Sequence, residues 1–164
     1  FQNPSAYLNP NRTVENHFKD LFRAHGESYE IARVIDMLKL VHLNDGERIL
    51  QSYPFQLSGG MQQRLAIALS LILKPSIVFA DEPTSALDML VQASVLDLMK
   101  EVTQALGATV IIVTHNIKSA ARIANSIGVM NKGQLVEVGS TEEVMACPKD
   151  EYTRVLLDSV TKVV

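Results

Sequence analysis

The chain has 164 residues, of which 47% are hydrophobic and 20% are charged, values typical of one globular domain. Its net charge of −3, with Lys and Arg scattered along the chain, predicts no nucleic acid partner. The only cysteine, Cys147, excludes a disulfide within one chain and indicates a reducing, cytosolic setting. The apolar runs are shorter than the ~20 residues of a membrane span, and no signal peptide is recognisable.

The first third of the chain predicts helices and no strand. Residues 1–10 are rich in Pro, Asn and Ser and predict a loop. Thr13 and Ser58 are suited to be N-caps, and Pro75 stops the strongest helix. Apolar residues at helical spacing predict helices over residues 13–22, 29–40 and 58–73, with a turn and a short helix over 44–53.

The later two thirds predict alternating strands and helices. Short apolar runs predict strands over residues 77–80, 109–114, 126–130 and 134–138, the first two buried on both faces. Helices are predicted over residues 91–106, 117–124, 141–145 and 152–160. This alternation predicts an α/β fold with a parallel sheet, in which ligands bind at the carboxyl ends of the strands.

A Ser-Gly-Gly run stands at the start of the strongest predicted helix. Ser58, Gly59 and Gly60 would leave backbone N–H groups open to an anion, at the helix end where the dipole favours negative charge. Taken alone, the same run also fits a capped helix after a flexible turn.

Acidic and imidazole groups follow the two apolar strands. Asp81 has the hard oxygen ligands that Mg²⁺ prefers, and Glu82 is suited to orient or deprotonate a water molecule. His115 follows the next strand and could donate to a phosphate, and residues 85–88 predict a tight loop. Taken alone, these residues also fit an acidic turn, a structural histidine and an N-cap.

In this order and spacing, the segments resemble the motifs of ABC transporter ATP-binding subunits. Residues 57–64 resemble the signature motif, residues 77–82 the Walker B motif and residues 85–88 the D-loop. His115 resembles the switch histidine, and residues 1–4 resemble the Q-loop.

The resemblance implies a role for each matched residue. It implies that Asp81 holds Mg²⁺, that Glu82 is the catalytic base and that His115 stabilises the γ-phosphate of ATP. The remaining residues carry roles at the nucleotide and the dimer interface: Ser58, Gly59 and Gly60 on the ATP of the opposite subunit, Gln2 on Mg²⁺ or the attacking water, and Asp88 in sealing the dimer.

The resemblance also implies an architecture and a setting. The expected fold is an incomplete P-loop NTPase-like parallel sheet core with an inserted α-helical subdomain. Residues 1–10 would be the Q-loop, 11–73 the helical subdomain with the signature, and 74–164 the C-terminal part of the RecA-like core. Expected partners are a second ATP-binding subunit and transmembrane permease subunits, at the cytoplasmic face of the membrane.

Finer traits resemble the oligopeptide, dipeptide and nickel importer branch. They are Leu8-Asn9-Pro10, Met61, Val91-Gln92-Ala93 and the tail over residues 152–157. Asn116 departs from that pattern because an Asp is common there. The branch implies import of a small solute, with peptides as the class, whereas the individual solute and the choice of homodimer or heterodimer are not encoded in these residues.

No GxxxxGK[ST] phosphate-binding loop occurs in the 164 residues. The expectation is that this loop precedes Phe1 together with several strands of the sheet. The chain by itself is then expected to expose apolar surface of residues 77–80 and 110–113, to be poorly soluble or swapped, and not to hydrolyse ATP. Two alternatives remain open from the sequence: an ABC-type ATPase acting on DNA or ribosomes, and an inactive half-domain with a binding role.

Overall fold

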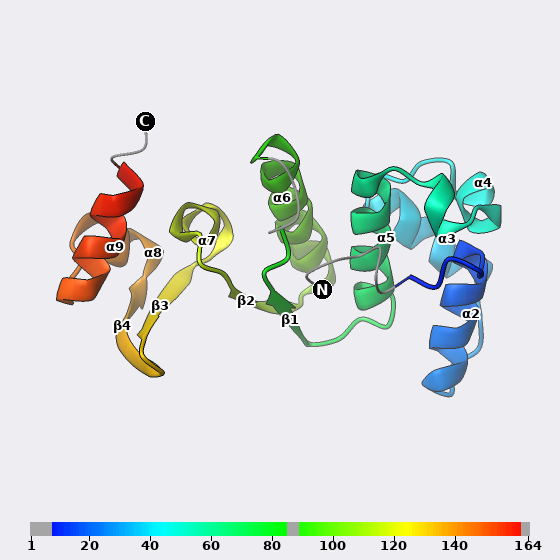
Figure 1. Cartoon of the computed structure of the whole chain (residues 1–164). Coiled ribbons are helices and arrows are strands. Elements are labelled where there is room, and N and C mark those ends of the chain that lie inside the picture. Colours follow the sequence, from blue (N-terminus) through cyan, green and yellow to red (C-terminus); the bar gives the residue numbers. More distant parts are fainter. Residues whose placement is uncertain (1–7, 85–88, 162–164) are drawn as a thin grey trace. The chain divides into compact units, whose positions relative to one another are not determined.

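The computed structural model describes residues 8–84 and 89–161. The chain divides into two compact units, Phe1–Val113 and Thr114–Val164, and each is considered by itself (Figure 1). The predicted elements are all present, with ends within about two residues of the predicted ones. In the first unit they are α2 (Val14–Ala24), α3 (Ile31–Leu40), α4 (Gly46–Gln51), the 3₁₀ helix η1 (Pro54–Gln56), α5 (Gly59–Leu71), β1 (Ile77–Asp81), α6 (Met89–Leu106) and β2 (Thr109–Val113).

The helices of the first unit surround one apolar cluster. In α2, Val14, Phe18 and Phe22 recur every four residues, so they lie on one face, and all three are fully buried. Thr13 caps this helix, as predicted, because its side-chain oxygen accepts a hydrogen bond from the backbone N–H of Asn16. The Phe22 ring also meets the Tyr29 ring edge to face at 6.0 Å.

Helix α5 is apolar around its whole circumference after its first turn and a half. Residues 65–69 are all buried, so this stretch is enclosed on every side. At the far end, the Arg33 guanidinium donates to the carbonyl oxygen of Ile72 at 2.6 Å, beside the last turn of α5. The helix is therefore anchored along its length, and its first turn projects from a rigid support.

Strands β1 and β2 pair in parallel, as predicted, from Ile77 opposite Thr109 to Asp81 opposite Val113. Val78, Ala80, Val110 and Ile112 belong to the apolar cluster, together with residues of α6. These strands are not buried on both faces in the chain by itself, and the expected exposure of apolar strand surface is confirmed, since Phe79 is 75% exposed and Val113 is 59% exposed. Side chains alternate between faces along a strand, so one face of the pair is covered and the other is not.

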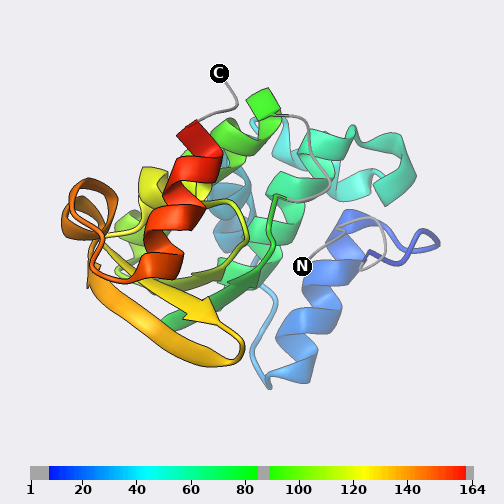
Figure 2. The same ribbon diagram turned by 60° about the vertical axis from the view of Figure 1, so that its left-hand side comes forward.

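The second unit contains α7 (Ile117–Ile123), β3 (Ser126–Asn131), β4 (Gln134–Ser140), α8 (Thr141–Ala146) and α9 (Glu151–Thr161). Its two strands form an antiparallel hairpin, a sheet separate from β1 and β2 (Figure 2). Lys132 and Gly133 both have positive φ, 49° and 78°, the backbone of a two-residue hairpin turn. A small core of Ile127, Val129 and Val144 holds the hairpin and helices together.

Candidate active site at the end of β1 and the start of α5

An acidic turn ends β1. Asp81 is the last residue of the strand and is exposed, and Glu82 follows it. Glu82 has φ of 44°, in the left-handed region, and its backbone N–H donates to the carbonyl oxygen of Val113 at 2.9 Å. This backbone costs a non-glycine residue about 1–2 kcal/mol. Such strain concentrates at functional sites, where the surroundings hold it in place.

The first turn of α5 offers bare backbone. Ser58 is the N-cap, as predicted, and its Oγ accepts from the Met61 backbone N–H at 3.3 Å. A Cβ added at Gly59 or at Gly60 would meet no atom within 4 Å, so packing within the chain does not require glycine at either position. The two glycines therefore leave open a surface with free helix-terminal N–H groups, suited to an anion.

A buried side chain joins this helix to the acidic turn. Gln63 of α5 is only 4% exposed, and its Nε2 donates to the carbonyl oxygen of Pro83 at 2.7 Å. Pro83 directly follows Glu82, so the helix of the Ser-Gly-Gly run and the acidic turn are linked within one unit. Sequence reasoning missed this contact because the two residues are 20 positions apart and nothing local predicts their pairing.

Three predicted site residues are not part of the described first unit. His115 is exposed and belongs to the second unit, between β2 and α7. The next residue, Asn116, caps α7 by accepting from the Ser119 backbone N–H at 3.2 Å. Gln2 and Asp88 lie outside the described residues.

The donor set at the acidic turn bears on which metal it could hold. Within residues 8–84 and 89–161, no three His, Cys, Asp or Glu side chains lie close enough together to bind a metal ion by themselves. Mg²⁺ in nucleotide sites commonly takes one or two carboxylates, and phosphates and waters complete its shell. The exposed Asp81 carboxylate therefore fits a magnesium ion carried by a nucleotide.

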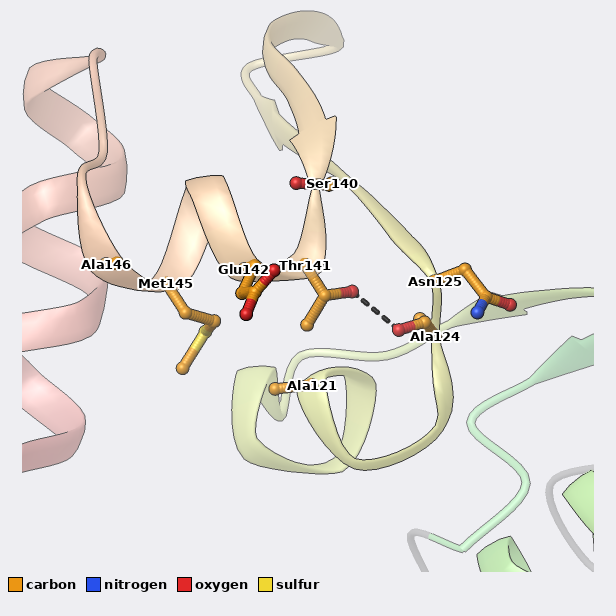
Figure 3. Close-up of a pocket in the computed structure, with 8 residues that line it drawn as sticks. All are labelled: Ala121, Ala124, Asn125, Ser140, Thr141, Glu142, Met145 and Ala146. Carbon is orange, nitrogen blue, oxygen red and sulfur yellow. Dashed lines mark hydrogen bonds between the residues drawn. The ribbon is translucent and has the colours of Figure 1, made fainter.

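A separate, open pocket of about 620 Å³ lies in the second unit between α7 and α8 (Figure 3). Thr141 Oγ1 donates to the carbonyl oxygen of Ala124 at 2.6 Å along its wall. Its lining includes one charged side chain, Glu142, together with Asn125 and several small or apolar residues. None of the predicted site residues that the structure describes lines this pocket.

The family model described as ABC transporter matches residues 1–85, which include the Ser-Gly-Gly run and the acidic pair. The chain belongs to the ABC transporter family. The resemblance of its motifs to those of ABC transporter ATP-binding subunits is therefore confirmed. The expected fold class, an α/β fold with an incomplete P-loop NTPase-like parallel sheet core and helical segments, is confirmed as well.

Three of the relatives that this chain resembles are named as ATP-binding proteins of transport or import systems. The dipeptide transport ATP-binding protein DppD of Caldanaerobacter subterraneus is 46% identical over 160 residues, which are 95% of this chain and 49% of that protein. OppD of Lactococcus lactis, an oligopeptide transport ATP-binding protein, is 40% identical over 97% of this chain and 48% of its own length. GsiA of Salmonella typhimurium, a glutathione import ATP-binding protein, is 42% identical over 98% of this chain and 26% of its own length.

This ABC transporter family chain thus spans about half the length of the DppD and OppD relatives it matches. Among the helices that the structure describes, none combines the length and the apolar character that crossing a membrane requires.

Proposed function

We propose that this chain is part of the ATP-hydrolysing subunit of an ABC transporter that imports a small solute, with peptides as the class. The observation that carries the proposal is the acidic pair Asp81–Glu82 at the carboxyl end of β1, tied through Pro83 to the helix that begins at Ser58. The names of the DppD and OppD relatives support peptides as the cargo.

The proposed reaction is transfer of the γ-phosphoryl group of ATP to water. The water oxygen bonds to the γ-phosphorus while the bond to the β,γ-bridging oxygen breaks, giving ADP and phosphate. Glu82 orients the water and takes its proton. Bound Mg²⁺ would supply charge neutralisation on the phosphates, and the exposed Asp81 carboxylate would hold it.

The other residues would contact the bound nucleotide and its magnesium ion or the second subunit. His115 would donate to the γ-phosphate, and Gln2 would contact the magnesium or the attacking water. Ser58, Gly59 and Gly60 receive the γ-phosphate of ATP held by a second subunit, for which the open surface over both glycines leaves room. Asp88 contributes to the contact between the two subunits. Permease subunits complete the transporter, which places this chain at the cytoplasmic face of the membrane.

The test uses the full-length protein reconstituted with its permease subunits in liposomes. Glu82→Gln should bind ATP with parental affinity and lose nearly all hydrolysis and peptide uptake, because the amide cannot accept the proton from water. Glu47→Gln, a change at an exposed glutamate of α4, is the matched control and should retain both activities. Parental hydrolysis by Glu82→Gln would rule out the proposed role of Glu82, and uptake of a solute other than peptides would rule out the cargo class.

A further inference from the structure

Gln63 is a polar residue that is buried among mostly apolar side chains. It lies in α5 two residues before the enclosed stretch 65–69 and is 4% exposed. It lines a cavity of about 50 Å³ together with Ile67, Phe79, Pro83 and Met99. A buried amide is stable in such surroundings only when its hydrogen bonds are made, so the bond to Pro83 is a constraint and not an incidental contact.

The bond from Gln63 holds a backbone position that has few groups able to form hydrogen bonds. Proline has no N–H, so the backbone at Pro83 can be held only through its carbonyl oxygen or its ring. Gln63 Nε2 holds that oxygen at 2.7 Å. One residue earlier, the backbone N–H of Glu82 is held by the Val113 carbonyl at 2.9 Å. The turn is therefore fixed on both sides of Glu82, by β2 and by α5.

We propose that Gln63 is a positioning residue for Glu82: its amide fixes the Pro83 carbonyl, and this holds the left-handed Glu82 and aims its carboxylate. The proposal rests on the proposed function, in which Glu82 activates water. Gln63 touches neither ATP nor water in this account and acts only through the backbone of the turn.

Helix α5 joins the two proposed sites. Ser58 and Gln63 are five residues apart on this helix, about 7.5 Å along its axis. Under the proposed function, Ser58 serves ATP held by the partner subunit, and Gln63 positions a residue that serves this chain's own ATP.

The experiment measures ATP hydrolysis and thermal unfolding of the full-length protein with its partner subunits. Gln63→Met keeps the length and bulk of the side chain but cannot donate. It should lower kcat by about 10–100-fold, the cost of a misplaced catalytic group, with little change in KM for ATP at temperatures where the protein is fully folded. Ser70→Ala is the matched control: Ser70 lies in the same helix and lines the same cavity, but its Oγ donates to Ala66 of its own helix. It should keep the parental kcat.

A second variant supplies a readout that a purely structural role would not change. Gln63→Glu cannot donate while ionised, but the protonated carboxyl has an O–H that can reach the Pro83 carbonyl. Its kcat, taken as a ratio to the parent at each pH, should rise as the pH falls.

Three results would overturn the proposal: parental kcat in Gln63→Met, a loss of kcat that only follows the loss of folded protein, or a pH-independent ratio in Gln63→Glu. Glu82→Gln in the same assay separates the two levels of inference. If Glu82→Gln hydrolyses ATP like the parent, the proposed function fails. If Glu82→Gln is inactive and Gln63→Met hydrolyses ATP like the parent, only the positioning role fails.

Discussion

Replacing Gly60 with alanine should make the protein more stable and less active. Gly60 is the second residue of α5, and a Cβ there would meet no atom within 4 Å. Alanine is favoured over glycine by up to ~1 kcal/mol inside a helix. In the first turn we expect about half of that gain in folding free energy. For a domain of this size, a gain of about 0.5 kcal/mol raises Tm by roughly 1–2 °C.

The loss of activity has a separate cause. If a partner's phosphate must approach the N–H groups of this turn within hydrogen-bond distance, about 2.9 Å, a methyl group on the open surface blocks it. Loss of such a backbone anion contact in a catalytic site typically lowers kcat about 100-fold or more. We therefore expect the ATPase rate of the assembled transporter to fall by roughly that factor in Gly60→Ala.

Gly107→Ala is the matched control, with the opposite effect on Tm and no effect on the ATPase rate. Gly107 directly follows α6 and has φ of 67°, and its added Cβ would also meet open space. Alanine there is strained by about 1 kcal/mol, so Tm should fall while the ATPase rate stays parental. Differential scanning calorimetry and a coupled ATPase assay measure both quantities. Parental ATPase activity in Gly60→Ala would refute the reasoning on phosphate access. A Tm of Gly60→Ala below that of the parent would refute the reasoning on packing.

Two further outcomes follow from buried groups. Phe22→Ala should lower the free energy of unfolding by about 3–5 kcal/mol, since the ring is fully buried, whereas Phe22→Leu should lower it by clearly less. Urea unfolding measures both losses, and equal losses would contradict the packing described. The pKa of Glu137 is lowered from its ordinary value of 4.5, chiefly by the hydrogen bond from the Lys149 backbone N–H at 2.9 Å, with a further contribution from the Asp150 backbone N–H at 3.1 Å. This stabilisation is present above pH 4.5 and lost as the pH falls through the lowered pKa, so the parent should lose stability there more steeply than Glu137→Gln, as followed by circular dichroism.

The order and type of the elements could be predicted because they depend on local patterns. The four-residue recurrence from Val14 to Phe22 and the capping side chains of Thr13 and Ser58 act within a few residues, and the structure confirms them. The apolar run at β1 fits burial on both faces, whereas Phe79 is exposed in the chain by itself, because an apolar run does not reveal how many neighbours cover a strand.

The candidate site could be predicted in its parts but not in its connections. Asp81 and Glu82 stand out as carboxylates at the end of an apolar run, and Gly59 and Gly60 as glycines at a helix start. The bond from Gln63 to Pro83 and the positive φ of Glu82 arise from tertiary packing, which neighbouring residues do not encode. The same holds for Glu137, a charged residue in a strand whose carboxylate holds the backbone before α9.

The backbone angle of Glu82 sets stability and activity against each other. At φ of 44° the conformation alone favours glycine or asparagine, and a glutamate is present at a cost in folding free energy. Improvement of the protein for heat resistance would therefore tend to remove this side chain first, together with the proposed chemistry. A search for thermostable variants that does not also score ATP turnover would select against the proposed water-activating group.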